Sequence, residues 1–195
     1  MRSAARLLIA LATLALALGA AACSRSQDTA ATPTLTGSAS VVSPTAGPAP
    51  TPVVLGEVTE TDPDSVADAV AVTLSVHDTR TDTSSQAVWA RALPWLTSDL
   101  AASAQAGGAS EVERPDNRWA MMQSHQAHDV VENIDRHTDD PIPDTATGAQ
   151  RQRAVSVRAY GDNGWSGLVR TTRYWLTMTN VDGAWRVSVV RSVID

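Results

Sequence analysis

The sequence predicts an α+β domain in which N-terminal helices pack on a curved, four-stranded antiparallel sheet. Three observations predict this class. Apolar residues recur at spacings of three and four between residues 62 and 123, which is typical of amphipathic helices. From residue 127 onward apolar and polar residues alternate, as in half-buried strands. Asp182-Gly183 lies between two such runs and indicates a tight turn, and helices followed by a run of strands favour the α+β class.

The first helix is expected to begin at Asp62-Pro63-Asp64. Proline suits the first helical position, and acidic residues face the positive end of the helix dipole. One apolar stripe follows, and we expect it to face the core. Its members are Val66, Ala69, Val70, Thr73, Leu74 and His77.

Three shorter helices are expected next. The second begins where Thr83 and Gln86 have capping-box spacing and ends at Pro94. The residues of its buried face are Trp89, Ala92 and Leu93. A third helix runs from a Thr97 cap to Gly107-Gly108. A fourth covers residues 116–123 and carries Trp119 and Met122.

Four strands are expected in the second half of the chain. The first covers residues 127–137, and its shared face is expected to carry Val130, Glu132, Ile134 and Arg136. The second covers residues 153–160 and the third residues 168–179. The last begins at Trp185, after the tight turn, and runs to the C-terminus.

Residues 1–22 are typical of a secretory signal peptide. Arg2 and Arg6 precede a short apolar run, and small residues follow up to Cys23. The apolar run, residues 7–18, is shorter than the roughly 20 residues that a membrane-spanning helix needs. We therefore expect an exported protein, and a transmembrane anchor is the alternative interpretation of this segment.

Cys23 is the only cysteine in the chain, so it cannot form an internal disulfide. Its place directly after Ala20-Ala21-Ala22 resembles the bacterial lipobox. Ala20 stands where leucine is usual, and Leu18 lies two residues further back. The resemblance implies cleavage before Cys23 and acylation of its thiol, with palmitate-type chains that hold the protein on the outer face of the cell membrane. Ordinary secretion with a free thiol is the alternative.

Residues 23–56 predict a disordered tether. This stretch is rich in Ser, Thr, Ala, Pro and Gly and cannot bury enough apolar surface to offset the entropy of ordering. We interpret it as a spacer, and residues 57–195 as a single domain. The formal net charge of −6 argues against nucleic acid as a partner and against electrostatic docking on anionic lipid.

The order of the elements is similar to that of the nuclear-transport-factor-2-like proteins, a cone of helices laid over a bent antiparallel sheet. The residues that carry the resemblance are the run Trp89-Ala90-Arg91-Ala92-Leu93-Pro94-Trp95-Leu96-Thr97, Trp119, and Gly183-Ala184-Trp185-Arg186-Val187. The nearest likeness is to envelope proteins of high-GC Gram-positive bacteria, namely conjugal-transfer scaffolds and mammalian-cell-entry-associated proteins. The resemblance implies a cone interior that is an active site, a ligand pocket or a filled core.

Pocket and contact residues are assigned within this expected fold. The residues expected at the cone pocket are His77, Trp89, Trp119 and Tyr174. Trp165 follows Gly161-Asp162-Asn163-Gly164, a sequence typical of a loop tip, and is the expected partner contact. Trp175 and Trp185 lie on predicted strands, where tryptophan usually belongs to the core.

Two clusters carry metal-ligating residue types. His125, His128 and Asp129 share one face if they are helical, but a passage from helix to strand at this point separates the rings. The alternative is an exposed polar turn. Residues 139–144 collect acids beside prolines, yet calcium prefers more oxygen ligands at regular spacing. We therefore expect no metal and no other cofactor.

General acid–base catalysis would need an ionisable group facing a hydrogen-bond donor inside the cone. The residues of suitable type are His77, Asp78, Asp129, Tyr160 and Tyr174. No pair among them has a diagnostic spacing, so no catalytic residue is assigned and enzymatic activity is left open. The leading hypothesis is a non-enzymatic lipoprotein that docks on an envelope protein of a membrane, secretion or transfer complex. The alternatives are a binder of a small apolar ligand or lipid in the cone and, third, an isomerase- or cyclase-like enzyme. The oligomeric state is left open.

Overall fold

A computed structural model describes residues 55–107, 117–136 and 142–195, all within one compact unit, Pro44–Asp195. The predicted signal peptide, Cys23 and most of the tether lie outside the described residues, as do Asp139 and Asp140. Within the described ranges, no helix combines the length and apolarity that crossing a membrane requires.

The element order confirms the predicted α+β class, with helices first and strands second. The helices are α1 (Pro63–Ser75), α2 (Ala87–Ala92), the 3-10 turn η1 (Leu93–Trp95), α3 (Ser98–Gln105) and α4 (Asn117–Ser124). The strands are β1 (His128–Asp135), β2 (Gly148–Tyr160), β3 (Ser166–Val181) and β4 (Ala184–Ile194), with the 3-10 turn η2 (Asp162–Gly164) before β3.

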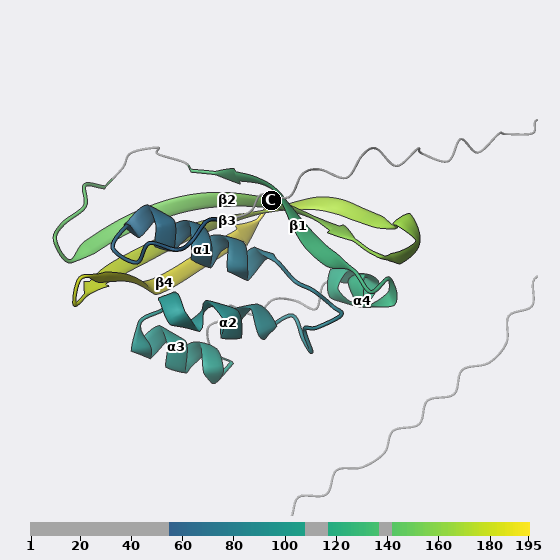
Figure 1. The fold of residues 1–195 in the computed structure, drawn as a ribbon, viewed down its shortest axis with the longest axis horizontal. Helices are drawn as coiled ribbons and strands as arrows, with labels where there is room; N and C mark the ends of the chain where they lie inside the picture. The colour runs from purple at the N-terminus through teal and green to yellow at the C-terminus, as the bar shows by residue number, and fades with distance from the viewer. Residues whose placement is uncertain (1–54, 108–116, 137–141) are drawn as a thin grey trace, which may run out of the picture. The chain divides into compact units, whose positions relative to one another are not determined.

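The four strands form one sheet in the order β1-β2-β3-β4, with antiparallel neighbours. Figure 1 shows the long strands bending over α1, with α2 and α3 on the same side of the sheet as α1. The turn between β3 and β4 is the predicted one, because Asp182 and Gly183 both have positive φ, 53° and 89°. Positive φ at both central residues gives the turn whose twist matches the flanking strands.

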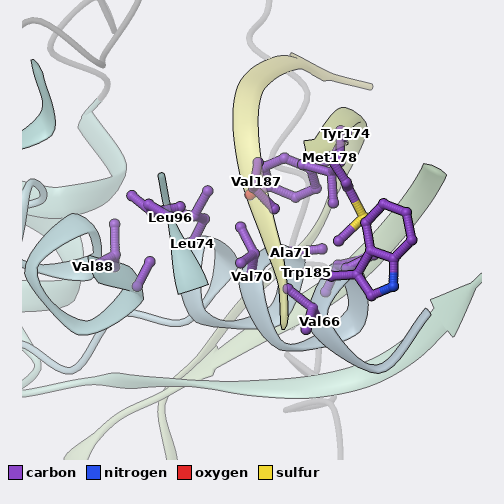
Figure 2. Packing of buried hydrophobic residues seen from close by; sticks show 14 of the residues in the cluster. Val66, Val70, Ala71, Leu74, Val88, Leu96, Tyr174, Met178, Trp185 and Val187 are labelled. Carbon is purple, nitrogen blue, oxygen red and sulfur yellow. The ribbon is translucent and has the colours of Figure 1, made fainter. Parts of the chain in front are cut away.

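The helix-facing side of the sheet, called the inner face below, holds the main core. Val66, Val70 and Leu74 of α1 are buried against it, which confirms the predicted apolar stripe. The residues they pack on are Val155, Val157, Tyr174, Leu176, Met178, Trp185 and Val187 (Figure 2). Each fully buried large apolar side chain stabilises the fold by about 1.5–3 kcal/mol, so this layer fixes α1 on the sheet.

The second helix is shorter than predicted, and the capping box is not formed. Gln86 occupies the N-cap position of α2 with helical backbone angles and makes no side-chain cap hydrogen bond. Pro94 lies in η1, directly after α2, which agrees with a proline that cannot continue an α-helix. Beyond it, the Thr97 backbone N–H donates to the Val187 carbonyl at 2.9 Å and ties this region to β4.

One strand prediction is wrong. Val130 and Ile134 do not share a face of β1, because the register with β2 shifts between Val131 and Asn133. A bulge adds one residue and reverses the alternation beyond it. Val131 and Ile134 therefore both pack towards the core, although they are three positions apart and would lie on opposite faces of a regular strand.

Candidate functional site

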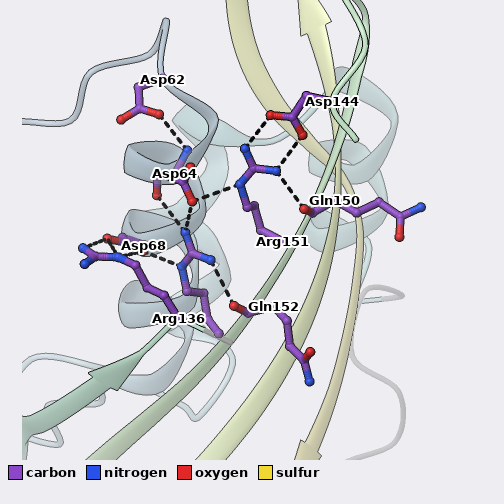
Figure 3. Close-up of polar contacts among 9 residues, drawn as sticks. Asp62, Asp64, Asp68, Arg136, Asp144, Gln150, Arg151 and Gln152 are labelled. Atoms are coloured by element: carbon purple, nitrogen blue, oxygen red, sulfur yellow. Dashed lines mark hydrogen bonds and ion pairs between the residues drawn. The ribbon is translucent and has the colours of Figure 1, made fainter. Parts of the chain in front are cut away.

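Two polar clusters and one exposed apolar surface stand out in the described part of the chain. The first cluster joins α1 to β2 (Figure 3). The Arg153 guanidinium, whose side chain is only 2% exposed, donates to the carboxylates of Asp64 and Asp68. Arg151 donates to Asp64 at 2.9 Å and to Asp144 at 2.6 Å. Arg136 also pairs with Asp68, so charges of both signs alternate across the cluster.

The electrostatics of this cluster indicate a structural role. Burial acts to raise the pKa of Asp64, but hydrogen bonds from Arg153 and Arg151 outweigh it and hold the pKa below its usual value. The Asp64 carboxylate is thus kept ionised beside its two arginine partners. A local pattern on each element could have predicted this contact between α1 and β2. Asp64 and Asp68 lie one helical turn apart, and Arg151 and Arg153 lie on one face of a strand.

The second cluster centres on Asp129 in β1. The Asp129 side chain is fully inaccessible to solvent, and its carboxylate accepts from the His77 backbone N–H at 3.1 Å. His77 Nδ1 lies 3.2 Å from the same oxygen. Arg118 of α4 donates to both carboxylate oxygens, and the Trp119 ring meets the His77 ring edge-on with 5.9 Å between centroids.

This environment makes Asp129 a poor proton acceptor. Burial acts to raise its pKa, but the hydrogen bonds from His77 and Arg118 dominate, and the net pKa is lowered. A general base works best with a pKa near the operating pH. The geometry therefore supports Asp129 as the group that joins α4 and the end of α1 to β1. No local spacing predicts the pair, because His77 and Asp129 are 52 residues apart.

The four residues expected at a cone pocket lie in different surroundings. His77 and Trp119 belong to the Asp129 cluster. Tyr174 is 4% exposed in the main core, where its hydroxyl lies 2.9 Å from Ser75 Oγ. Trp89 is half-buried against the same core. Their assignment to one pocket stays a prediction, and the apolar side chains of α1 pack against those of the inner face (Figure 2).

The His125, His128 and Asp129 side chains, which are of metal-ligating types, do not gather at one point. α4 ends at Ser124 and β1 begins at His128, and the His125 ring stacks on Trp165 with 4.4 Å between centroids and an 8° interplanar angle. Asp129 faces Arg118 and His77 instead. Among the described residues, no three His, Cys, Asp or Glu side chains gather closely enough to hold a metal ion.

Trp165, the expected partner contact, is half-buried. It packs beside Met122, Ala127 and Ala159 in a small second core. The tryptophan that the structure exposes is Trp175, at 40% of its surface, although its place on a strand favoured the core. Alternation defines the two faces of a strand without showing which face the helices cover.

The side of the sheet away from the helices, the outer face, carries an apolar patch on β3 and β4. Trp175 lies directly opposite Arg191, and its diagonal neighbours on β4 are Val189 and Val193. Diagonal side chains on one face of a sheet are within reach of a large aromatic residue. Val189 is 43% and Val193 53% exposed. We call these four residues the outer patch.

The wider distribution of exposed apolar residues agrees with this location. Most of the strongly exposed large apolar side chains in the described ranges lie on β3 and β4. Those outside the outer patch on these strands are Leu168, Val169, Val181 and Ile194. Contiguous exposed apolar residues mark interaction surfaces more often than scattered ones do.

Comparison with known proteins finds weak structural likeness and no similarity in sequence. No known protein family matches this chain, and no characterised protein is recognisably similar to it in sequence. The chain is similar to the structure of the Agrobacterium tumefaciens VirB8 protein, with 10% sequence identity and a TM-score of 0.40. The match covers 72% of this chain and 96% of that chain. At this TM-score the likeness carries no argument about function, and the α+β class rests on the element order itself.

Proposed function

We propose that the chain is a lipid-anchored envelope protein whose domain is a non-enzymatic interaction module. The outer patch carries the proposal. It places an exposed tryptophan between two exposed valines and opposite an arginine on the outer face of the sheet, and tryptophan and arginine are enriched among the residues that dominate binding energy at protein interfaces.

The chemistry of the patch indicates the kind of partner. Arg191 lies opposite Trp175, and Arg173 on the same face pairs with Asp195 at 3.0 Å. A partner that offers apolar side chains ringed by acidic groups would complement this surface. The packing of α1 on the inner face and the paired state of Asp129 favour this module over a ligand enclosed between the centre of α1 and the sheet and over acid–base catalysis.

The anchor and tether complete the proposal. Acylation at Cys23 and a spacer of residues 23–56 would hold the domain near the membrane while leaving it free to reach a partner in the envelope. As part of the same proposal, we assign the chain to the nuclear-transport-factor-2-like envelope proteins, because that assignment fits an anchored domain on a tether. Mass spectrometry of the mature N-terminal peptide tests the anchor, and we expect Cys23 at the first position, carrying a diacylglycerol group.

Site-specific photo-cross-linking in living cells tests the docking surface. A photoreactive amino acid is placed at position 175 or 193 in the full-length protein, and the matched control position is Met121, an exposed apolar residue on α4. We expect one partner protein to be captured from both outer-face positions and not from position 121.

The Cys23→Ala variant separates the anchor from the surface. With the anchor removed, capture of a membrane-bound partner should fall sharply, because the tethered domain loses its high local concentration at the membrane. Equal capture from positions 121 and 175 would refute the outer patch as the docking site, as would no capture from position 175 in the acylated protein.

A further inference from the structure

A second feature lies away from the outer patch, at the free edge of β1. Among the strands of the described residues, β1 has a neighbour on one side only, and a pocket of about 620 Å³ opens there against the flank of α1. Its apolar wall includes Val72, Val76, Trp95, Val130 and Val131. The volume falls within the roughly 300–1,000 Å³ that small-molecule sites occupy.

The polar groups around the pocket differ in what they can still bind. Arg91 lines it, but its guanidinium is already held by the Asp82 carboxylate and the Val76 carbonyl. Asp129 is saturated by its donors. His128 also lines the pocket, and its buried Nδ1 has no hydrogen-bond partner among the described residues. A buried nitrogen without a partner costs free energy that a ligand atom can recover.

We propose that this pocket binds the acyl chain of a neutral, single-chain amphiphile, with the headgroup hydrogen-bonded to His128 Nδ1. The apolar wall matches a hydrocarbon chain. A neutral hydroxyl or ester carbonyl suits the headgroup position, because Arg91 is neutralised by Asp82 and so offers little to an anion. This inference is independent of the proposed docking function, since none of the outer-patch residues lines the pocket.

An extended peptide is the competing occupant, since a strand can add to a free sheet edge beside a helix. The edge of β1 is poorly suited to this. Its first residues are already paired, with the Asp129 backbone N–H donating to the His77 carbonyl at 2.7 Å. The bulge between Val131 and Asn133 then breaks the regular ladder, and bulges at sheet edges hinder strand addition.

Quenching of tryptophan fluorescence tests the proposal. The probe is a monoacylglycerol whose acyl chain carries bromine, added to the unacylated Cys23→Ser chain below the concentration at which it self-associates. Bromine quenches tryptophan only at contact, so we expect quenching that disappears in Trp95→Phe and persists in Trp175→Phe. Quenching that disappears in Trp175→Phe instead would place the probe on the outer patch and overturn the proposal.

Pocket-filling variants provide the second readout. Val72→Phe should weaken binding at least tenfold, and Val130→Phe, on a strand that tolerates aromatic residues, repeats the test should the first variant fail to fold. Val193→Phe on the exposed outer face is the matched control and should bind normally. His128→Leu should weaken binding roughly fivefold through one lost hydrogen bond, and His128→Asn should restore most of it. Unchanged affinity in both pocket-filling variants would overturn the proposal.

The same probe distinguishes two sources of the acyl chain. Quenching in both the unacylated chain and the acylated protein indicates a free lipid as the ligand. Quenching in the unacylated chain alone indicates that the acyl chain on Cys23 itself occupies the pocket. Absence of quenching in the unacylated chain contradicts binding from either source.

Discussion

Tyr174 and Trp175 are neighbours in β3, yet one belongs to the core and the other to the surface. Tyr174 is 4% exposed on the inner face, whereas Trp175 is 40% exposed on the outer face. The whole sheet repeats this difference, because the helices that contact it pack on the inner face. The inner face therefore determines stability, and the aromatic and basic side chains of the outer face are available to bind a partner. Substitutions on the two faces should separate these roles.

The largest effect is expected at Trp185, which is 7% exposed on the inner face beside Val187. Trp185→Ala should lower the free energy of unfolding by about 4 kcal/mol, through lost burial and the cavity left behind. Denaturant unfolding followed by circular dichroism measures the change. Trp175→Ala is the matched control, and equal costs at the two positions would contradict the division between the faces.

A slightly smaller effect is expected at Asp129, the buried carboxylate of the inner face. Asp129→Asn should cost about 3 kcal/mol at neutral pH, because it leaves the Arg118 guanidinium with a neutral partner in a largely buried site. The cost should shrink in acid. The pKa of Asp129 is lowered in the folded state, so its ionised form stabilises the protein above the ordinary carboxyl pKa of about 4.

As the pH falls through the folded-state pKa of Asp129, that stabilisation is lost in the wild-type chain and is already missing in the variant. Unfolding curves collected from neutral pH down to about pH 2 should therefore bring the two proteins closer together. A difference in stability that stays constant across this range would show that Asp129 acts through packing and not through its charge.

Tyr174 offers a smaller test on the inner face. Tyr174→Phe removes the contact with Ser75 Oγ at 2.9 Å but leaves the ring in the core. Ser75 keeps its hydrogen bond to the Ala71 carbonyl at 2.8 Å, so no new unsatisfied hydroxyl arises there. We expect a cost of about 1 kcal/mol, the net value of one hydrogen bond. A cost as large as that of Trp185→Ala would indicate that the hydroxyl supports a wider network.

Local patterns were enough to predict the parts of the fold that local physics determines. The apolar stripe of α1 follows from helical periodicity, and the Asp182-Gly183 turn follows from the need for positive φ. The bulge at Val131 could not be predicted, because an inserted residue leaves no compositional mark. The faces of β1 were therefore misassigned.

The candidate sites were less predictable than the fold, because they depend on contacts between distant segments. His77 was recognised as a residue on the apolar stripe, but its partner Asp129 follows from the three-dimensional arrangement alone. The exposure of Trp175 and the half-burial of Trp165 have the same origin. Sequence alternation assigns residues to faces, and only the packing of the helices decides which face is covered.

The smallest effect on stability is expected at Trp175 on the outer face, where a substitution should instead have a large effect on partner binding. Trp175→Ala should change the free energy of unfolding by less than about 0.5 kcal/mol, as is usual for exposed positions. The same change should weaken capture of the partner in cells at least tenfold, since truncating a central aromatic residue of an interface commonly costs 2 kcal/mol or more, roughly thirtyfold in affinity. Val169→Ala, at an exposed position of β3 outside the outer patch, should leave both quantities unchanged. Loss of capture in both variants would show that the interface extends along β3, whereas normal capture in Trp175→Ala would refute docking through the outer patch and leave its exposed apolar surface without a function.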